Sequence, residues 1–222
     1  GRASAAVYEP EETVAALLAS AGMELEGWID RGQTQVALVL RPDRWRAAVF
    51  RGTEFSSGPL LNRARDVLRN TRLTNLFSGT VPGLGIGRAH QGYARNLREV
   101  WEELEAARAA RPADLPWISA GHSLGGATAT LHAAALHGAP ALVSFGAPTA
   151  GDREVLSRLG AVHRVIFAGD VMARWVWFST YLRHPPAPPV RLRWPRGWWR
   201  LYRHCPADYV AALERLASST GG

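Results

Sequence analysis

LPWISAGHSLGGA, residues 115–127, contains the strongest structural signal in this chain of 222 residues. Residues 115–120 form an uncharged, largely apolar run that predicts a buried strand, and residues 127–137 predict a helix. Between them, glycines at both ends of Gly121-His122-Ser123-Leu124-Gly125 permit a sharp turn. The simplest alternative is a glycine-rich turn with an incidental serine. A turn of this kind between a strand and a helix instead favours Ser123 as an exposed nucleophile at the end of a sheet.

Outward from this segment, strand and helix patterns alternate along the chain. Strands are predicted at residues 35–40, 45–50, 115–120, 141–145 and 162–168, and helices at 11–21, 93–109, 127–137, 153–159 and 208–217. The first two strands are separated by a short Arg41-Pro42-Asp43 connection, which favours an antiparallel pair. The later alternation predicts an α/β fold with a mainly parallel sheet covered by helices on both faces.

Length and composition place the whole chain, residues 1–222, in one domain. At 47% hydrophobic residues, a chain of this size buries roughly 70% of the surface that it exposes when unfolded. The single cysteine, Cys205, has no internal disulfide partner, and no Cys/His spacing resembles a metal site. Residues 1–10 lack the basic start and apolar run of a signal peptide, so such a peptide is either absent or already removed. We expect no transmembrane span, so the chain is predicted to be soluble and its location is left open.

The net charge of +7 raises the question of an anionic partner such as nucleic acid or a membrane surface. All 26 basic residues are arginine. A chain without lysine indicates a general arginine bias, which explains much of the charge without any ligand. We therefore predict no nucleic-acid partner.

A serine nucleophile needs a histidine base and a carboxylate that orients the histidine. Hydrolases with this turn carry them later in the chain, in the order serine, carboxylate, histidine. Asp170 is the only downstream carboxylate that immediately follows an apolar strand pattern, whereas Asp152 is better placed to cap the helix that follows it. Asp170 is therefore the predicted acid.

Two histidines follow Asp170, and the sequence does not decide between them. His184 precedes Pro185 in a segment predicted to be exposed, while His204 precedes an amphipathic helix that would anchor it. A rigid mount favours His204 as the base. His122, His132 and His137 are interpreted as structural or helix-surface residues.

Several motifs occur in an order that resembles the class 3 lipases, the fungal-type triacylglycerol lipases with their bacterial and plant relatives. They are VFRGTE at 49–54, HQGY at 90–93, GHSLGGA at 121–127, FGAP at 145–148, and Asp170 after its strand. The resemblance covers roughly residues 35 to 213. It implies an α/β-hydrolase fold, no cofactor and no metal.

The resemblance also implies an oxyanion hole made by the backbone N–H groups of Thr53 and Leu124. Residues 54–61 follow Thr53 where the family often carries a mobile lid, although a plain surface loop fits equally well. The family acid is usually followed by a Val-Pro turn, whereas Asp170 is followed by Val171 and Met172. Pro206 and the altered segment between Asp170 and His204 keep His184 open as an alternative base.

An unusual insertion is predicted at about residues 171–203. It contains five of the nine tryptophans, seven arginines and five prolines, and no acidic residue. Tryptophan and arginine together suit a lipid surface, so the segment could make peripheral membrane contact beside the active site. The alternative is an irregular loop whose tryptophans pack onto the domain.

Together these features predict a serine hydrolase, a lipase or esterase, that cleaves carboxylic esters with apolar acyl chains. Ser123, His204 and Asp170 form the predicted triad. The alternatives are a catalytically inactive lipid-binding protein on the same scaffold, and an acyltransferase that passes the acyl group to an alcohol. Triglyceride, phospholipid and small esters are not distinguished.

Overall fold

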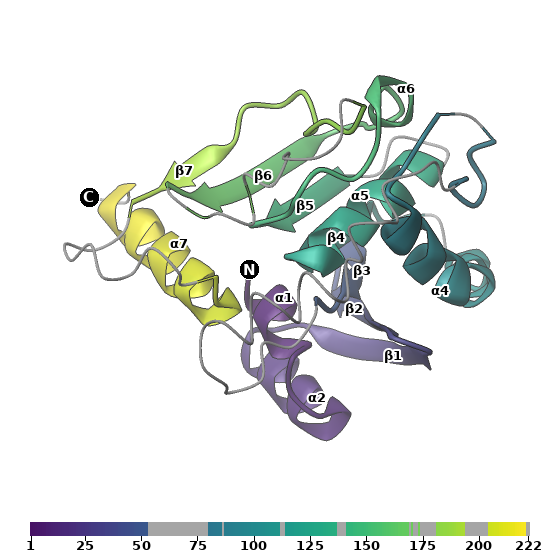
Figure 1. Ribbon diagram of the computed structural model, residues 1–222. Coiled ribbons are helices and arrows are strands. Elements are labelled where there is room, and N and C mark those ends of the chain that lie inside the picture. The colour runs from purple at the N-terminus through teal and green to yellow at the C-terminus, as the bar shows by residue number, and fades with distance from the viewer. Residues whose placement is uncertain are drawn as a thin grey trace.

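A computed structural model describes residues 1–52, 80–85, 87–111, 114–136, 141–168, 170, 173, 181–193 and 204–220. Its described strands form one sheet in the order β1-β2-β3-β4-β5-β6-β7 (Figure 1). The strands are β1 Glu24–Arg31, β2 Thr34–Arg41, β3 Trp45–Phe50, β4 Trp117–His122, β5 Ala141–Phe145, β6 Val162–Phe167 and β7 Val190–Leu192. The predicted mainly parallel sheet is confirmed, because every pairing from β3 to β7 is parallel.

The predicted antiparallel pair is also confirmed, as β2 pairs with β3 from Val36 opposite Phe50 to Arg41 opposite Trp45. The sequence patterns missed both edge strands. β1 pairs with β2 but is interrupted by a register shift between Leu25 and Gly27, and its exposed charged residues hide any apolar run. β7 has only three residues, which is too short to give an alternating pattern.

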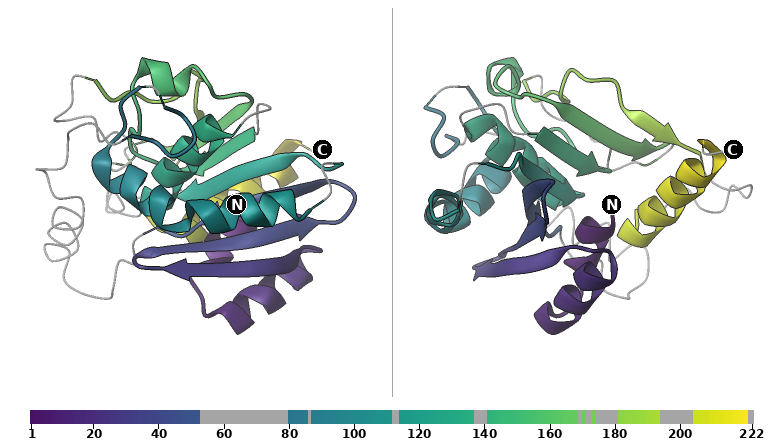
Figure 2. Two further views of the ribbon diagram at one scale, coloured as in Figure 1. Left: turned by 90° about the vertical axis from the view of Figure 1, so that its right-hand side faces the viewer. Right: turned by 180° about the vertical axis from the view of Figure 1, so that it is seen from behind.

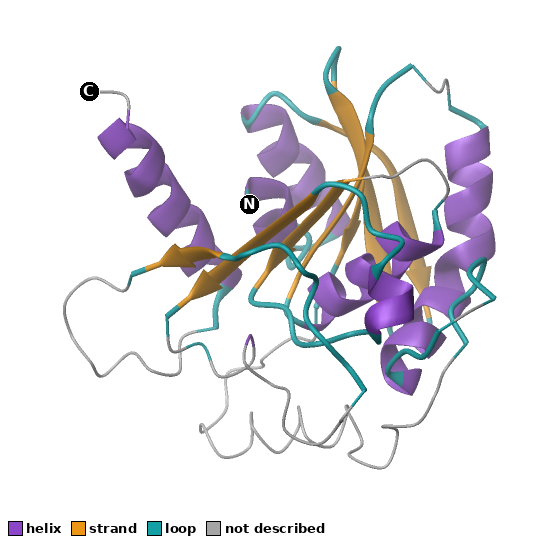
Figure 3. Ribbon diagram, turned by 90° about the horizontal axis from the view of Figure 1, so that it is seen from above, coloured by secondary structure: helices purple, strands orange, loops and turns teal. Residues whose placement is uncertain are grey.

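Helices cover both faces of the sheet (Figure 2). The described helices are α1 Arg2–Ala6, α2 Glu11–Ser20, α4 Gln91–Ala109, α5 Leu124–Ala135, α6 Arg153–Leu156 and α7 Pro206–Thr220. One face carries α4, α5 and α6, and the other carries α1, α2 and α7, so that the strands fan out between two helical layers (Figure 3).

The core follows this layering. The largest buried cluster lies under α4 and α5 and includes Leu97, Leu104 and Leu131, each almost fully enclosed. Two smaller clusters lie on the other face, one with Leu18 of α2 and one with Tyr209 of α7. Burying a leucine side chain contributes roughly 1.5–3 kcal/mol, so the apolar stripe of α4 holds that helix against the sheet.

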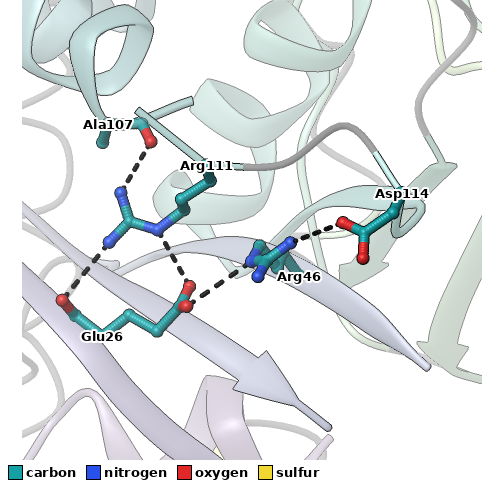
Figure 4. A network of polar contacts seen from close by, with 5 residues as sticks. All are labelled: Glu26, Arg46, Ala107, Arg111 and Asp114. Atoms are coloured by element: carbon teal, nitrogen blue, oxygen red, sulfur yellow. Dashed lines mark hydrogen bonds and ion pairs between the residues drawn. The ribbon is translucent and has the colours of Figure 1, made fainter. Parts of the chain in front are cut away.

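A network of polar contacts links β1, at one edge of the sheet, to β3 and to the C-terminal end of α4 (Figure 4). The Glu26 carboxylate on β1 accepts from Arg111 Nε at 2.9 Å and from Arg46 Nε of β3 at 3.4 Å. Arg111 also donates to the Ala107 carbonyl oxygen at the end of α4, and Arg46 to Asp114. The two mostly buried guanidinium groups therefore each have a carboxylate partner.

Two local features position the site. α5 begins at Leu124, earlier than predicted, because Ser123 occupies the N-cap and the glycines that follow are already helical. α6 begins after Asp152, whose side chain accepts the Val155 N–H at 3.0 Å, so the predicted cap is confirmed.

Candidate active site

Ser123 sits in a strained turn between β4 and α5. Its backbone has φ 56° and ψ −127°, a conformation that a non-glycine residue adopts at a cost of order 1–3 kcal/mol. The Ser123 N–H donates to the Phe145 carbonyl oxygen at 2.9 Å, which ties the turn to the end of β5. The Ser123 hydroxyl is buried and bonds no residue in the described part of the chain. The neighbouring fold therefore holds Ser123 in this conformation with its hydroxyl uncommitted.

Gly125 shows why the turn requires a residue without a side chain. A Cβ atom at this position would lie 2.3 Å from the carbonyl oxygen of Phe50. The obstacle is the backbone of β3, which cannot rotate away as a side chain can. The close approach brings the end of β3, Phe50, and the next residue, Arg51, beside the first turn of α5.

His204 and Asp170 are in direct contact. The His204 Nδ1 atom lies 2.7 Å from the Asp170 Oδ2 atom. The side chains are 10% and 1% exposed, respectively, so the pair is almost shielded from water. His204 comes just before α7 and Asp170 just after β6, which means that 34 residues separate two groups that share a hydrogen bond.

Asp170 receives two further hydrogen bonds. The Tyr209 hydroxyl donates to Oδ2, and the Ala173 N–H donates to Oδ1 at 3.2 Å. Burial alone would raise the pKa of Asp170, but His204, Tyr209 and Ala173 together hold it below its ordinary value. The carboxylate therefore stays charged and can accept a hydrogen bond from a protonated ring nitrogen of His204.

The His204–Asp170 pair lies beside the turn that holds Ser123. A Cβ atom on Gly146, the residue after the carbonyl that binds Ser123, would lie 2.6 Å from His204 Cε1 and 2.8 Å from Asp170 Oδ2. The ring of His122, which precedes Ser123, lies 4.5 Å from the His204 ring between centroids. The structure thus gathers the three predicted triad residues at the carboxyl edge of the parallel strands.

Tyr8 contacts the residues around Ser123, and the sequence patterns did not predict this. Its hydroxyl lies 2.9 Å from His122 Nδ1 and accepts the Gly52 N–H at 3.1 Å. Burial raises the pKa of the Tyr8 hydroxyl and lowers that of His122 well below its ordinary value, so both groups stay neutral. No local pattern marks a tyrosine after a five-residue helix as part of a site more than 100 residues away.

The other histidines lie elsewhere. Within the described residues, His184 makes no hydrogen bond or ion pair with Asp170. It lies near Arg164, and burial lowers its pKa to about 4. His132 is buried in the core with Nδ1 2.8 Å from the Ser119 hydroxyl. His90 caps α4 by accepting the Gly92 N–H, and burial lowers its pKa to about 4.

Several predicted features lie outside the described residues. They are Thr53, the possible lid at residues 54–61, His137, and most of the segment at 171–203, including all five of its tryptophans. Leu124, the other predicted oxyanion donor, is the first residue of α5. Its N–H group belongs to the first helical turn, where backbone donors have no partner within the helix.

Residues 47–179 match the family described as Lipase (class 3). The chain belongs to the class 3 lipase family. No curated protein sequence matches this class 3 lipase. Family membership supports a lipase or ester hydrolase activity, and the sheet with helices on both faces is that of the α/β-hydrolases.

Solved structures of fungal lipases resemble this class 3 lipase in fold. A mutant form of MDLA from Penicillium cyclopium has a TM-score of 0.66 and 20% identity, over 87% of this chain and 77% of that one. The nonglycosylated LIP2 lipase of Yarrowia lipolytica has a TM-score of 0.62 and 18% identity, over 82% and 70%. A Rhizomucor miehei lipase propeptide complex has a TM-score of 0.63 and 21% identity, over 80% of this chain but only 57% of its own.

Two features are absent from the described residues. No helix in these ranges is both long enough and apolar enough to cross a membrane. Within the same part of the chain, no three His, Cys, Asp or Glu side chains gather in a way that would hold a metal ion.

Proposed function

We propose that this class 3 lipase cleaves carboxylic esters with apolar acyl chains through an acyl-enzyme formed on Ser123. The observation that carries the proposal is the 2.7 Å contact between His204 Nδ1 and Asp170 Oδ2 beside the strained turn of Ser123. Geometry of this kind, rather than fold alone, is what supports a reaction mechanism.

The first half of the proposed reaction forms the acyl-enzyme. When Nδ1 carries the ring proton and donates a hydrogen bond to the Asp170 carboxylate, the lone pair of His204 is on Nε2. Nε2 takes the proton of the Ser123 hydroxyl while Oγ bonds to the ester carbonyl carbon. When the tetrahedral intermediate collapses, the bond to the alcohol oxygen breaks and His204 returns the proton to the leaving alcohol.

The second half repeats these steps with water. Water attacks the acyl carbon while His204 takes one of its protons, and the bond to Ser123 Oγ breaks with return of that proton. The products are the carboxylic acid and free Ser123. The charge on the reacting carbonyl oxygen is to be stabilised by the N–H groups of Leu124 and Thr53, each worth about 100- to 1,000-fold in rate.

The experiment that tests the nucleophile compares two serine variants on p-nitrophenyl esters of graded chain length. Ser123→Ala should lower kcat by at least about 10⁴-fold. Ser157→Ala, at an exposed serine of α6's C-cap, should leave kcat unchanged. A reactive phosphonate ester should label the peptide that contains Ser123. Full turnover in Ser123→Ala, or labelling at another residue, would refute the proposal.

The base is tested by a second pair of variants. His204→Ala should remove turnover, whereas His184→Ala should keep it, because His204, unlike His184, contacts Asp170. Loss of activity confined to His184→Ala would overturn the assignment. Methanol added to the assay identifies acyl transfer, since an acyltransferase would yield mainly methyl ester in place of free acid.

Peripheral contact with lipid through residues 171–203 stays a prediction from composition. Co-sedimentation with liposomes of neutral and of anionic lipid tests it. The five tryptophans and seven arginines of this segment predict binding that is stronger to anionic liposomes and weaker at high salt. Failure to bind either kind would remove this role.

A further inference from the structure

Arg164 occupies an unusual position in the middle of β6. Its neighbours Val165 and Phe167 belong to the cluster that packs against Tyr209 of α7. Successive side chains of a strand point to opposite faces of the sheet, so Arg164 and Ile166 point to the face that carries α5 and α6. A charged residue therefore stands where the strand pattern calls for an apolar one.

Arg164 is buried without a compensating acid. It is only 7% exposed. In the described part of the chain it has neither a hydrogen bond nor an ion pair. Arg46 and Arg111 show the contrast, because each of these mostly buried guanidinium groups contacts Glu26 (Figure 4). A buried charge without a partner opposes folding, so such a residue is expected to have an anion.

Ser144 lies directly opposite Arg164 in the register of β5 and β6. It is 3% exposed, and its hydroxyl bonds nothing among the residues that the structure describes. Residues opposite each other on parallel strands point to the same face. A hydroxyl donor and a guanidinium group thus lie side by side on this face, and neither has a hydrogen bond to another side chain or carbonyl in the described ranges.

Two further basic side chains approach the same place. Arg191 of β7 pairs with Ile166 and so points to the face of Arg164. His184 has an enclosed Nδ1 atom that makes no hydrogen bond within the described ranges. The positive charge of Arg164 acts on His184, and that of Arg191 acts on Arg164, which places these groups within electrostatic range of one another.

We propose that Arg164, Ser144, Arg191 and His184 form a binding site for a phosphate-class oxyanion. Guanidinium groups bind such oxygens through paired N–H donors, and the hydroxyl and imidazole N–H supply donors from other directions. A tetrahedral anion with several acceptor oxygens can use this many converging donors, whereas a carboxylate offers only two oxygens. None of these four residues belongs to the proposed triad, and the inference does not depend on the proposed reaction.

The test measures the Tm of the full chain by calorimetry in sodium phosphate and in sodium chloride of equal ionic strength. The wild type should gain about 5 °C or more once phosphate exceeds its Kd about 100-fold. Arg164→Met should lose this gain, and in chloride its Tm should equal or exceed that of the wild type. Arg158→Met, at an exposed arginine, is the matched control and should respond like the wild type.

If Arg164→Met does not fold, Arg191→Met provides the test. Because Arg191 is exposed, its substitution should leave the chain folded and should raise the Kd for phosphate about tenfold. Glycerol 3-phosphate forms a second arm. Tighter binding than inorganic phosphate identifies a phosphomonoester ligand, and equal or weaker binding identifies the free ion. The proposal is overturned if phosphate does not raise the wild-type Tm, if Arg164→Met gains as much as the wild type, or if Arg191→Met and Arg158→Met have the same Kd.

Discussion

Tyr8→Phe removes one hydroxyl and should weaken both the fold and the reaction. Without it, the Gly52 N–H and the Nδ1 of His122 lose the partners that now lie at 3.1 Å and 2.9 Å. Both residues are buried, and a buried polar group left without a partner costs about 1–3 kcal/mol. Taking the lower figure for each, since Tyr8 itself is only half-buried, we expect a loss of about 2 kcal/mol in the free energy of unfolding.

For a chain of this size that loss corresponds to a fall in Tm of about 4–8 °C. The catalytic effect follows from position, because Gly52 leads into Thr53 and His122 precedes Ser123. A displacement of about 1 Å at reacting groups can cost about 100-fold in rate, so we expect kcat to fall about 10- to 100-fold with little change in KM. Calorimetry and p-nitrophenyl butyrate kinetics measure the two effects.

Tyr93→Phe is the matched control for stability. Tyr93 is also buried, but within the described residues its hydroxyl has no hydrogen-bond partner, so the same chemical change should leave the Tm nearly unchanged. The reasoning fails if Tyr8→Phe keeps the wild-type Tm and kcat. If only the Tm falls, Tyr8 stabilises the fold without positioning the reacting groups.

Gly125→Ala should destabilise the chain by at least about 3 kcal/mol in urea unfolding, since its Cβ would meet the Phe50 carbonyl oxygen at 2.3 Å. Gly85→Ala, with positive φ but open space, should cost only about 1 kcal/mol, and equal losses would contradict the steric argument. Tyr209→Phe removes a hydrogen bond to the Asp170 carboxylate. It should lower the free energy of unfolding by about 1.5–3 kcal/mol and kcat about tenfold. An unchanged kcat would show that this hydrogen bond does not position Asp170 for the reaction. Folding lowers the pKa of Asp170, so the charged carboxylate stabilises the folded state. This stabilisation is complete above the unfolded-state pKa of about 3.9 and is lost as the pH falls through the lower pKa of the folded state. The stability difference between wild type and Asp170→Asn, followed by urea unfolding, should therefore be constant above about pH 5 and shrink towards pH 3, and a difference that does not change with pH would refute the assigned charge state.

Local sequence patterns were enough to predict most of the fold. The apolar runs of β2 to β6 and the amphipathic stripe of α4 are signals contained within single elements, so each is visible without knowledge of its neighbours. The sequence patterns missed the edge strands for two reasons. β1 has exposed charged residues at both ends and a register shift in its middle, and β7 has only three residues, so neither strand leaves a clear local signal. The turn of Ser123 was predictable because its constraint, glycine at both ends, lies within five residues.

The layered fold, Ser123 at its turn, and the candidates Asp170, His184 and His204 could all be predicted from the sequence. The three-dimensional structure was needed to show that His204 contacts Asp170, that Tyr8 lies beside Gly52 and His122, and that Arg164 lies opposite Ser144. The physical reason is the range of the interactions. Helix and strand signals act over a few residues, whereas these contacts depend on how strands and helices that are distant in the chain pack against one another.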